Sequence, residues 1–137
     1  MTSALSAGER VHIVAYNDFE VIHISTLLEI ANVDMAQVDF LVCPTDDFWV
    51  RDNGPIFVED AQGDWAILNW GFNGWGGDAP YSLDDDVPLL AGNALGLPVV
   101  DLSAVVLEGG AIEMDGQGTL MATRSSITGT DRNPGLT

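Results

Sequence analysis

The stretch FWVRDNGPIFVEDAQGDWAILNW, residues 48–70, joins a polar motif to a hairpin signature. Its first eight residues, FWVRDNGP (48–55), place Arg51 and Asp52 directly before a Gly-Pro stop. Two apolar runs then flank Gly63, a pattern that is typical of a β-hairpin. On an extended strand, neighbouring side chains point to opposite faces, so Arg51 and Asp52 would not pair across one surface. We therefore expect Asp52 to face some other partner.

Strands and helices alternate on either side of this hairpin. A continuous apolar run such as VDFLVC is typical of a strand that is buried on both faces. An acidic first turn, as in the Asp84–Leu95 segment, suits the dipole of a helix. The segments read as strand 10–16, helix 19–31, strand 38–43, hairpin 55–70, glycine-rich loop 71–80, helix 84–95, strand 98–100 and hairpin 111–124. The order predicts an α/β protein made of two similar units.

Composition restricts the class of protein. The chain has 137 residues, is 47% hydrophobic and has no long apolar run, so we expect one globular domain spanning 1–137. It has 21 acidic residues, four arginines and no lysine, and this charge opposes binding to nucleic acid or anionic membranes. A single cysteine and no recognisable signal peptide favour a reducing, cytoplasmic location.

Asp52 and Trp49 can be interpreted in two ways. An ionised carboxylate accepts two parallel hydrogen bonds from a guanidinium, and an indole face adds cation–π attraction of about 1–2 kcal/mol when desolvated. The two residues could therefore clamp a planar cation. Alternatively, Trp49 is a core residue and Asp52 is an acceptor in a turn, which is common chemistry for Asp before Asn-Gly.

Two further motifs carry candidate residues. The loop WGFNGWGG (70–77) has two interpretations: it could line a ligand pocket through Trp75, or its rings could fill the core. In LEGGAIEMDG (107–116), Glu108 could fix the tautomer of an imidazole, or be a hydrogen-bonded acid in a turn. Glu113 and Asp115 are expected to be solvated. Because this half of the chain has no histidine, we expect neither a metal nor another cofactor there.

The possible nucleophile and bases lie elsewhere in the sequence. Cys43 ends an apolar run and is expected to be an inert core thiol. His12, in an alternating strand, is expected to be partly buried, and His23, on a helix flank, to be solvated. No nucleophile-elbow motif is present.

Taken together, four segments in order resemble one family. They are FWVRDNGP, WGFNGWGG, LEGGAIEMDGQGTLMAT and DRNPGLT, and they resemble the agmatine deiminase and Porphyromonas-type peptidylarginine deiminase family of the pentein superfamily. The resemblance implies an α/β propeller of five ββαβ-type units, of which this chain matches about two. It also implies hydrolysis of a guanidinium C–N bond with release of ammonia.

The resemblance also implies roles for individual residues. In this family a cysteine thiolate attacks the guanidinium carbon, and a histidine protonates the leaving ammonia and activates water. By position, Asp52 matches the aspartate that binds the guanidinium, Trp49 the aromatic beside it, and Glu108 the glutamate that orients the histidine. Cys43, His12 and His23 do not match the nucleophile or the base.

These expectations leave three hypotheses. Family members are more than twice as long, so the chain could be an inactive portion of a deiminase. It could instead bind a guanidinium compound (agmatine or an arginine side chain) or a polyamine without reacting. It could also be an assembly module, because an open part-propeller exposes strand edges and apolar faces. In each case we expect a homo-oligomer or a complementing chain.

Overall fold

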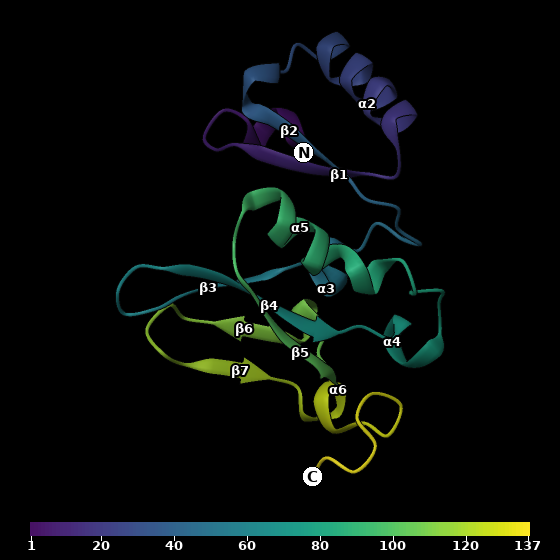
Figure 1. The fold of residues 1–137 in the computed structure, drawn as a ribbon, viewed down its shortest axis with the longest axis vertical. Coiled ribbons are helices and arrows are strands. Elements are labelled where there is room, and N and C mark those ends of the chain that lie inside the picture. Colours follow the sequence, from purple (N-terminus) through teal and green to yellow (C-terminus); the bar gives the residue numbers. More distant parts are fainter. The chain divides into compact units, whose positions relative to one another are not determined.

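The computed structural model describes residues 1–137 and has a mixed helix-and-strand architecture (Figure 1). The chain divides into two compact units, Met1–Pro44 and Thr45–Thr137. The predicted strands and the two predicted helices are present in the expected order. Short helices at 2–5, 50–53, 74–77 and 124–128 were not predicted, and the one at 74–77 lies in the segment expected to be an irregular loop.

The first unit is a βαβ arrangement. Two parallel strands pair with Val11 opposite Val38, and Asn17 caps the connecting helix by accepting a hydrogen bond from the Glu20 amide (3.0 Å). The helical spacing of Val21, Ile24, Leu28 and Ala31 predicts this helix. The first three of these residues are partly buried, whereas Ala31, at the end of the helix, is exposed. The elements are α1 (Thr2–Leu5), β1 (Val11–Ala15), α2 (Asp18–Ile30), η1 (Met35–Gln37) and β2 (Val38–Val42).

The expectation that residues 38–43 are buried on both faces is wrong. Val38 is buried, but Val42 is exposed and the residues between them are only partly covered. A sheet of two strands has no central strand, so neither strand is flanked by neighbours on both sides. Cys43, directly after β2, is fully buried, which confirms its predicted placement.

The second unit contains a three-stranded sheet and a separate hairpin. The sheet has the order β3-β4-β5, in which β4 is antiparallel to β3 and parallel to β5. The last hairpin, β6–β7, forms its own antiparallel pair. The elements are α3 (Val50–Asn53), β3 (Ile56–Glu59), β4 (Trp65–Gly71), α4 (Gly74–Gly77), η2 (Asp84–Asp86), α5 (Val87–Leu95), β5 (Val99–Val106), η3 (Gly109–Ala111), β6 (Ile112–Met114), β7 (Leu120–Ala122) and α6 (Arg124–Thr128).

The core of the second unit lies between α5 and the sheet. Ile67 of β4 and Val87 and Ala91 of α5 are buried together with Phe72. The helix lies directly on the strands, because a β-carbon added at Gly92 would come within 2.2 Å of a Val99 methyl group. The loops that carry the candidate site follow the carboxyl ends of β4 and β5.

The two predicted hairpins share one turn chemistry. In the β3–β4 hairpin, Asp60 Oδ1 accepts hydrogen bonds from the amides of Gln62 (2.8 Å) and Asp64 (3.0 Å). In the β6–β7 hairpin, Asp115 Oδ1 accepts from the amides at the corresponding two positions, Gln117 and Thr119. Both turns project to the same side of this unit in Figure 1. The same Asp side-chain turn therefore closes both predicted hairpins.

Two expectations about loops need correction. Arg51 and Asp52 do not lie on a strand, because residues 50–53 form the helical turn α3. The acidic run at 84–86 was expected only to interact with a helix dipole, but two of its carboxylates also bind backbone amides. The Asp84 carboxylate is buried and accepts hydrogen bonds from the Asp46 and Asp47 amides, while Asp85 accepts one from Phe72.

No helix in the structure combines the length and the hydropathy needed to cross a bilayer. The longest is α2, with 13 residues.

Candidate functional site

Asp52 lies where three of the sequence motifs meet. Its Oδ1 accepts a hydrogen bond from the Gly110 amide (3.0 Å), and its Oδ2 accepts one from the indole Nε1–H of Trp75 (3.1 Å). The helical turn α3 aims the carboxylate, since the Trp49 carbonyl accepts the Asp52 amide (2.8 Å). FWVRDNGP, WGFNGWGG and LEGGAIEMDG are therefore joined at a single carboxylate.

Glycine is required on the side of η3 that faces Asp52. A β-carbon at Gly109 would lie 2.2 Å from the Arg51 carbonyl oxygen, and one at Gly110 would lie 2.2 Å from Asp52 Oδ1. Neither residue has positive φ, so close approach of the two backbones explains the Gly-Gly pair here. The motif brings the segment after Glu108 against α3.

Trp75 is held in a strained turn. Its φ is +58°, which is uncommon for a residue other than glycine. The Asn73 side chain accepts a hydrogen bond from the Gly76 amide (2.9 Å), and the Trp75 ring meets Phe72 edge to face, with centroids 5.2 Å apart. These contacts keep the indole N–H directed at Asp52. Trp75 therefore acts as a hydrogen-bond donor in addition to packing against Phe72.

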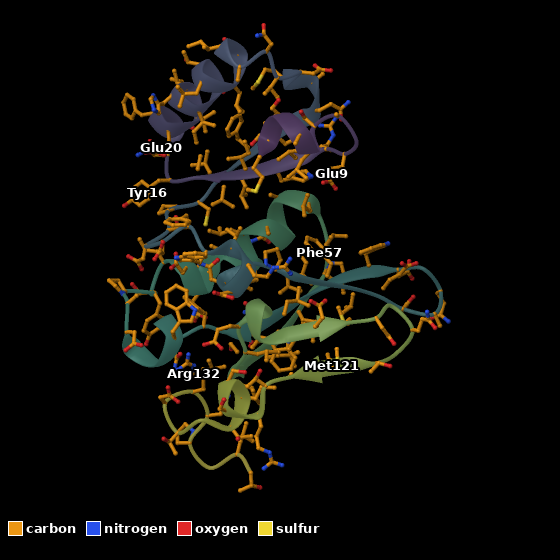
Figure 2. The ribbon with its side chains drawn as sticks, turned by 180° about the vertical axis from the view of Figure 1, so that it is seen from behind. Glu9, Tyr16, Glu20, Phe57, Met121 and Arg132 are labelled. Carbon is orange, nitrogen blue, oxygen red and sulfur yellow. The ribbon has the colours of Figure 1, made fainter.

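Glu108 is the buried acid of the site, with 4% of its surface exposed. Its Oε1 accepts a hydrogen bond from Nε of Arg132 (2.9 Å), and Nη1 of the same guanidinium contacts the Asp131 carboxylate. Burial alone would lower the pKa of Arg132, but the hydrogen bond and charge of Glu108, with Asp131, outweigh it and raise that pKa above its ordinary value. Arg132 is labelled in Figure 2.

The fourth motif, DRNPGLT, closes the cluster. Asn73 Nδ2 donates to the Asp131 carbonyl (2.9 Å), which links the Trp75 loop to the C-terminal segment. Asn133 is buried and bonds to both the amide and the carbonyl of Val106 (2.8 Å each), two residues before Glu108. All four motifs thus form one connected hydrogen-bonded cluster.

Arg132, Asn73 and Asn133 had no predicted role. One signal in the sequence could have identified Arg132. The chain has only four cations against 21 acids, so an arginine inside a motif is a strong candidate for a specific ion pair. The two asparagines give no comparable signal, because their partners are backbone groups.

Trp49 lies at the surface of the second unit. It is 49% exposed, so the alternative that made it a core residue is wrong. Its ring stacks on Phe48, with centroids 4.9 Å apart. The structure records no contact between its side chain and the carboxylate of Asp52, so a clamp would require the two to meet around a ligand.

The remaining candidates form no hydrogen bond or ion pair with the acids of this cluster. His12 is exposed, near Asp39 (3.7 Å), so the expectation that it is partly buried is wrong. It sits on an edge-accessible two-stranded sheet rather than inside a core. His23 is exposed as expected. Glu113 and Asp115 are exposed on the last hairpin, and no three His, Cys, Asp or Glu side chains are placed to hold a metal ion.

The cluster has a definite electrostatic character. The guanidinium of Arg132 pairs with the carboxylates of Glu108 and Asp131, whereas Asp52 accepts hydrogen bonds only from neutral groups of Trp75 and Gly110. Each oxygen of Asp52 accepts one hydrogen bond from a neutral donor, and a carboxylate has about four lone-pair positions in all. Asp52 therefore retains capacity for two more donors, which is what a planar guanidinium offers.

Comparison with known proteins assigns the family. An agmatine deiminase of Pseudomonas syringae pv. tomato is 38% identical over 112 residues, which are 78% of this chain and 30% of that protein. The structure of an agmatine deiminase of Enterococcus faecalis superposes with a TM-score of 0.81 at 28% identity, over 99% of this chain and 37% of that one.

An agmatine deiminase of C. jejuni with substrate bound superposes with a TM-score of 0.80 at 26% identity, over 98% of this chain and 38% of that one. These matches give the chain the pentein fold of agmatine deiminases, although its sheets do not close into a propeller. The chain spans about a third of the length of these relatives. The family model for Porphyromonas-type peptidyl-arginine deiminases matches residues 1–137, so the chain belongs to that family.

Proposed function

We propose that this chain recognises the guanidinium group in an agmatine deiminase-type reaction, the hydrolysis of a guanidinium C–N bond with release of ammonia. The observation that carries the proposal is the Asp52 carboxylate. Two neutral donors fix its position, and no cationic side chain neutralises it. A relative of this fold has been solved with substrate bound, which supports a guanidinium compound such as agmatine, or an arginine side chain, as the ligand.

The roles of the other residues follow from the same geometry. Trp75 restrains one oxygen of Asp52, and its indole borders the space in front of the carboxylate. Trp49 is half exposed one turn away and would cover a bound cation with its ring, for about 1–2 kcal/mol of cation–π attraction. Glu108, buried as an ion, would orient the catalytic imidazole.

We further propose that the chain alone does not turn over substrate. Its only cysteine, Cys43, is fully buried, so the thiol is not available to attack a ligand. Removing the nucleophile from a covalent mechanism lowers the rate by several orders of magnitude. In this proposal the chain is one partial domain of a five-unit cytoplasmic propeller, and other units supply the nucleophile and the base.

Calorimetry tests ligand recognition. We expect agmatine to bind the wild-type chain more tightly than putrescine does, because only agmatine carries a guanidinium. Asp52→Asn should weaken agmatine binding at least tenfold, whereas Asp64→Asn, which alters an exposed acid whose side chain forms no hydrogen bond or ion pair, should leave it unchanged. No heat with millimolar agmatine would refute the proposed recognition.

A turnover assay tests the second part. Incubation with agmatine and with a peptidyl-arginine substrate should release no ammonia above background. Turnover that survives Cys43→Ala but is abolished by Asp52→Ala would contradict the proposed inactivity.

A second candidate function, assembly, rests on α2. Phe19, Ile22 and Ile30 lie on one face of this helix at helical spacing, and all three are exposed. Such a stripe is expected to be covered by another copy or by a complementing chain. Sedimentation should show self-association that is lost in Phe19→Ser with Ile22→Ser; a monomer at all salt concentrations would exclude a homo-oligomer.

A further inference from the structure

We propose that Arg132 is a positioning residue that holds both acids of the candidate site, Glu108 by direct ion pairing and Asp52 through the Trp75 loop. This inference deepens the proposed guanidinium recognition and rests on it for its effect on ligand binding. Its structural part stands on contacts within the second unit and can be tested without any ligand.

The contact with Glu108 selects one of its two oxygens. Arg132 Nε donates to Oε1, and the structure records no hydrogen bond to Oε2. The Arg132 side chain is 17% exposed and that of Glu108 is 5% exposed, so the pair is shielded from water. Because Asn133 also fixes the backbone at Val106, the direction of the Glu108 side chain is restrained from both ends. Oε2 is left to meet an imidazole or a ligand N–H.

The contact with the Trp75 loop is steric. A β-carbon at Gly76 would lie 2.9 Å from Arg132 Nη1, so the backbone beside Trp75 rests against the guanidinium. The loop is fastened to the same segment by Asn73, which donates to the Asp131 carbonyl. Any movement of Arg132 is therefore transmitted to Trp75, whose indole holds Asp52 Oδ2.

The residue type suits this task. Nε and Nη1 of one planar guanidinium reach two different carboxylates, Glu108 and Asp131, which a lysine ammonium does not reproduce in a fixed geometry. Arg10, by comparison, forms an exposed pair with Asp39 in the first unit. Arg132 is the cation that pairs with both Glu108 and Asp131, so its removal would leave these two carboxylates without their partner.

The experiment compares Arg132→Lys and Arg132→Met with Arg124→Met. Arg124 is exposed on α6, and its side chain forms no hydrogen bond or ion pair, so it serves as the matched control. The first readout is the indole N–H resonance of Trp75 in a nitrogen-15 correlation spectrum, assigned with Trp75→Phe. The second is agmatine affinity by calorimetry.

We expect Arg132→Met to shift or broaden the Trp75 indole resonance while the indoles of Trp65 and Trp70 stay in place, and to weaken agmatine binding at least tenfold. Arg132→Lys keeps the positive charge but not the planar set of N–H donors. Compared with Arg132→Met, it should recover part of the agmatine affinity and a smaller part of the wild-type position of the Trp75 indole resonance. The Arg124 control should match the wild type. A folded Arg132→Met chain with unchanged indole resonance and unchanged affinity would overturn the inference.

The outcome is separable from that of the proposed function. If the wild type does not bind agmatine, the proposed recognition fails and the Trp75 resonance alone decides the positioning role. If Arg132→Met does not fold, Asp131→Asn and Arg132→Lys decide it, since neither leaves Glu108 without a cation. Both are expected to move the Trp75 resonance and to weaken agmatine binding about threefold. Two folded variants that match the wild type in both readouts would refute the inference.

Discussion

Asp52 and Glu108 are two acids of one cluster that are held in opposite ways. Glu108 is buried and paired with the guanidinium of Arg132, whereas Asp52 is partly exposed and receives only neutral donors, the Trp75 indole and the Gly110 amide. A buried carboxylate requires a cation because burial removes its hydration. A partly exposed one does not, and its charge stays available to a ligand.

This difference indicates a structural role for Glu108 and a ligand-binding role for Asp52. Glu108 is fixed and already neutralised, so it is suited to orienting another group. Asp52 is fixed in place but not neutralised, so it is suited to binding a cation. The predictions below test this distinction by removing the partners of each acid in turn.

The largest expected effect comes from the cation beside Glu108. Arg132→Met leaves a buried carboxylate without its partner, and breaking a buried pair in this way costs about 3–5 kcal/mol of unfolding free energy. Chemical denaturation of wild type and variant measures the loss. Asp52 has no cationic partner, so removing any one of its hydrogen-bond donors should lower the unfolding free energy by less.

The double variant Glu108→Leu with Arg132→Met sharpens this test. Removing both charges avoids the unpaired ion, so we expect it to recover most of the lost stability. A double variant as unstable as Arg132→Met alone would show that the ion pair is not the cause.

The next largest effect is steric and acts on Asp52. In Gly110→Ala the new methyl group would lie 2.2 Å from Asp52 Oδ1, so either η3 or the carboxylate must move. Overpacking of this kind costs about 1–3 kcal/mol. Thermal unfolding and agmatine calorimetry should both respond.

Gly8→Ala is the control for this variant, because its β-carbon would meet nothing closer than 4.0 Å. Gly110 does not have positive φ, so backbone strain cannot account for a difference between the two. Equal stability of both variants would contradict the close approach.

The elements of this fold were predictable from sequence because each has a local cause. Asn17 caps α2, and the Asp60 and Asp115 turns close the two hairpins, so periodicity and turn residues were sufficient. The conformation of residues 50–53 was not predictable. Nothing local distinguishes a strand from one helical turn there, and the contact with η3, 58 residues away, decides it.

The candidate residues were predictable as a set but not in their contacts. Asp52, Trp75 and Glu108 do belong to one cluster. Their partners could not be read from the sequence, since Trp75 depends on a left-handed backbone and Glu108 on an arginine 24 residues later. Trp49 was expected beside Asp52, but its exposed ring stacks on Phe48. The sequence does not reveal which neighbour an exposed ring will contact.

A smaller effect is expected from the neutral donor to Asp52. Trp75→Phe removes one hydrogen bond to a partly exposed carboxylate that water can replace, so the loss should be about 0.5–1.5 kcal/mol. Urea unfolding measures it. Trp65→Phe, at an exposed ring in β4, is the control and should change stability less. A loss as large as that of Arg132→Met would remove the distinction between the two acids.

The smallest effect extends the comparison to a fully exposed acid, Asp115. The amide of Gln117, then the groups of Thr119, lower the pKa of its carboxyl from the ordinary 3.8. A lowered pKa means that the ionised form is favoured by folding. The contribution of Asp115 to the hairpin is therefore complete above the unfolded pKa and is lost as pH falls through the folded one.

Carbon-13 detection of the Asp115 carboxyl should give a midpoint below that of the same residue in urea. The Gln117 and Thr119 amide resonances should shift through the same midpoint as their acceptor is protonated, while those of Gln62 and Asp64, which bond to Asp60, report the other turn separately. Because Asp115 is held by neutral donors alone, the lowered pKa of its carboxyl comes from hydrogen bonding and not from a nearby cation. A midpoint at or above the urea value would show that these neutral donors do not favour the ionised form in this turn.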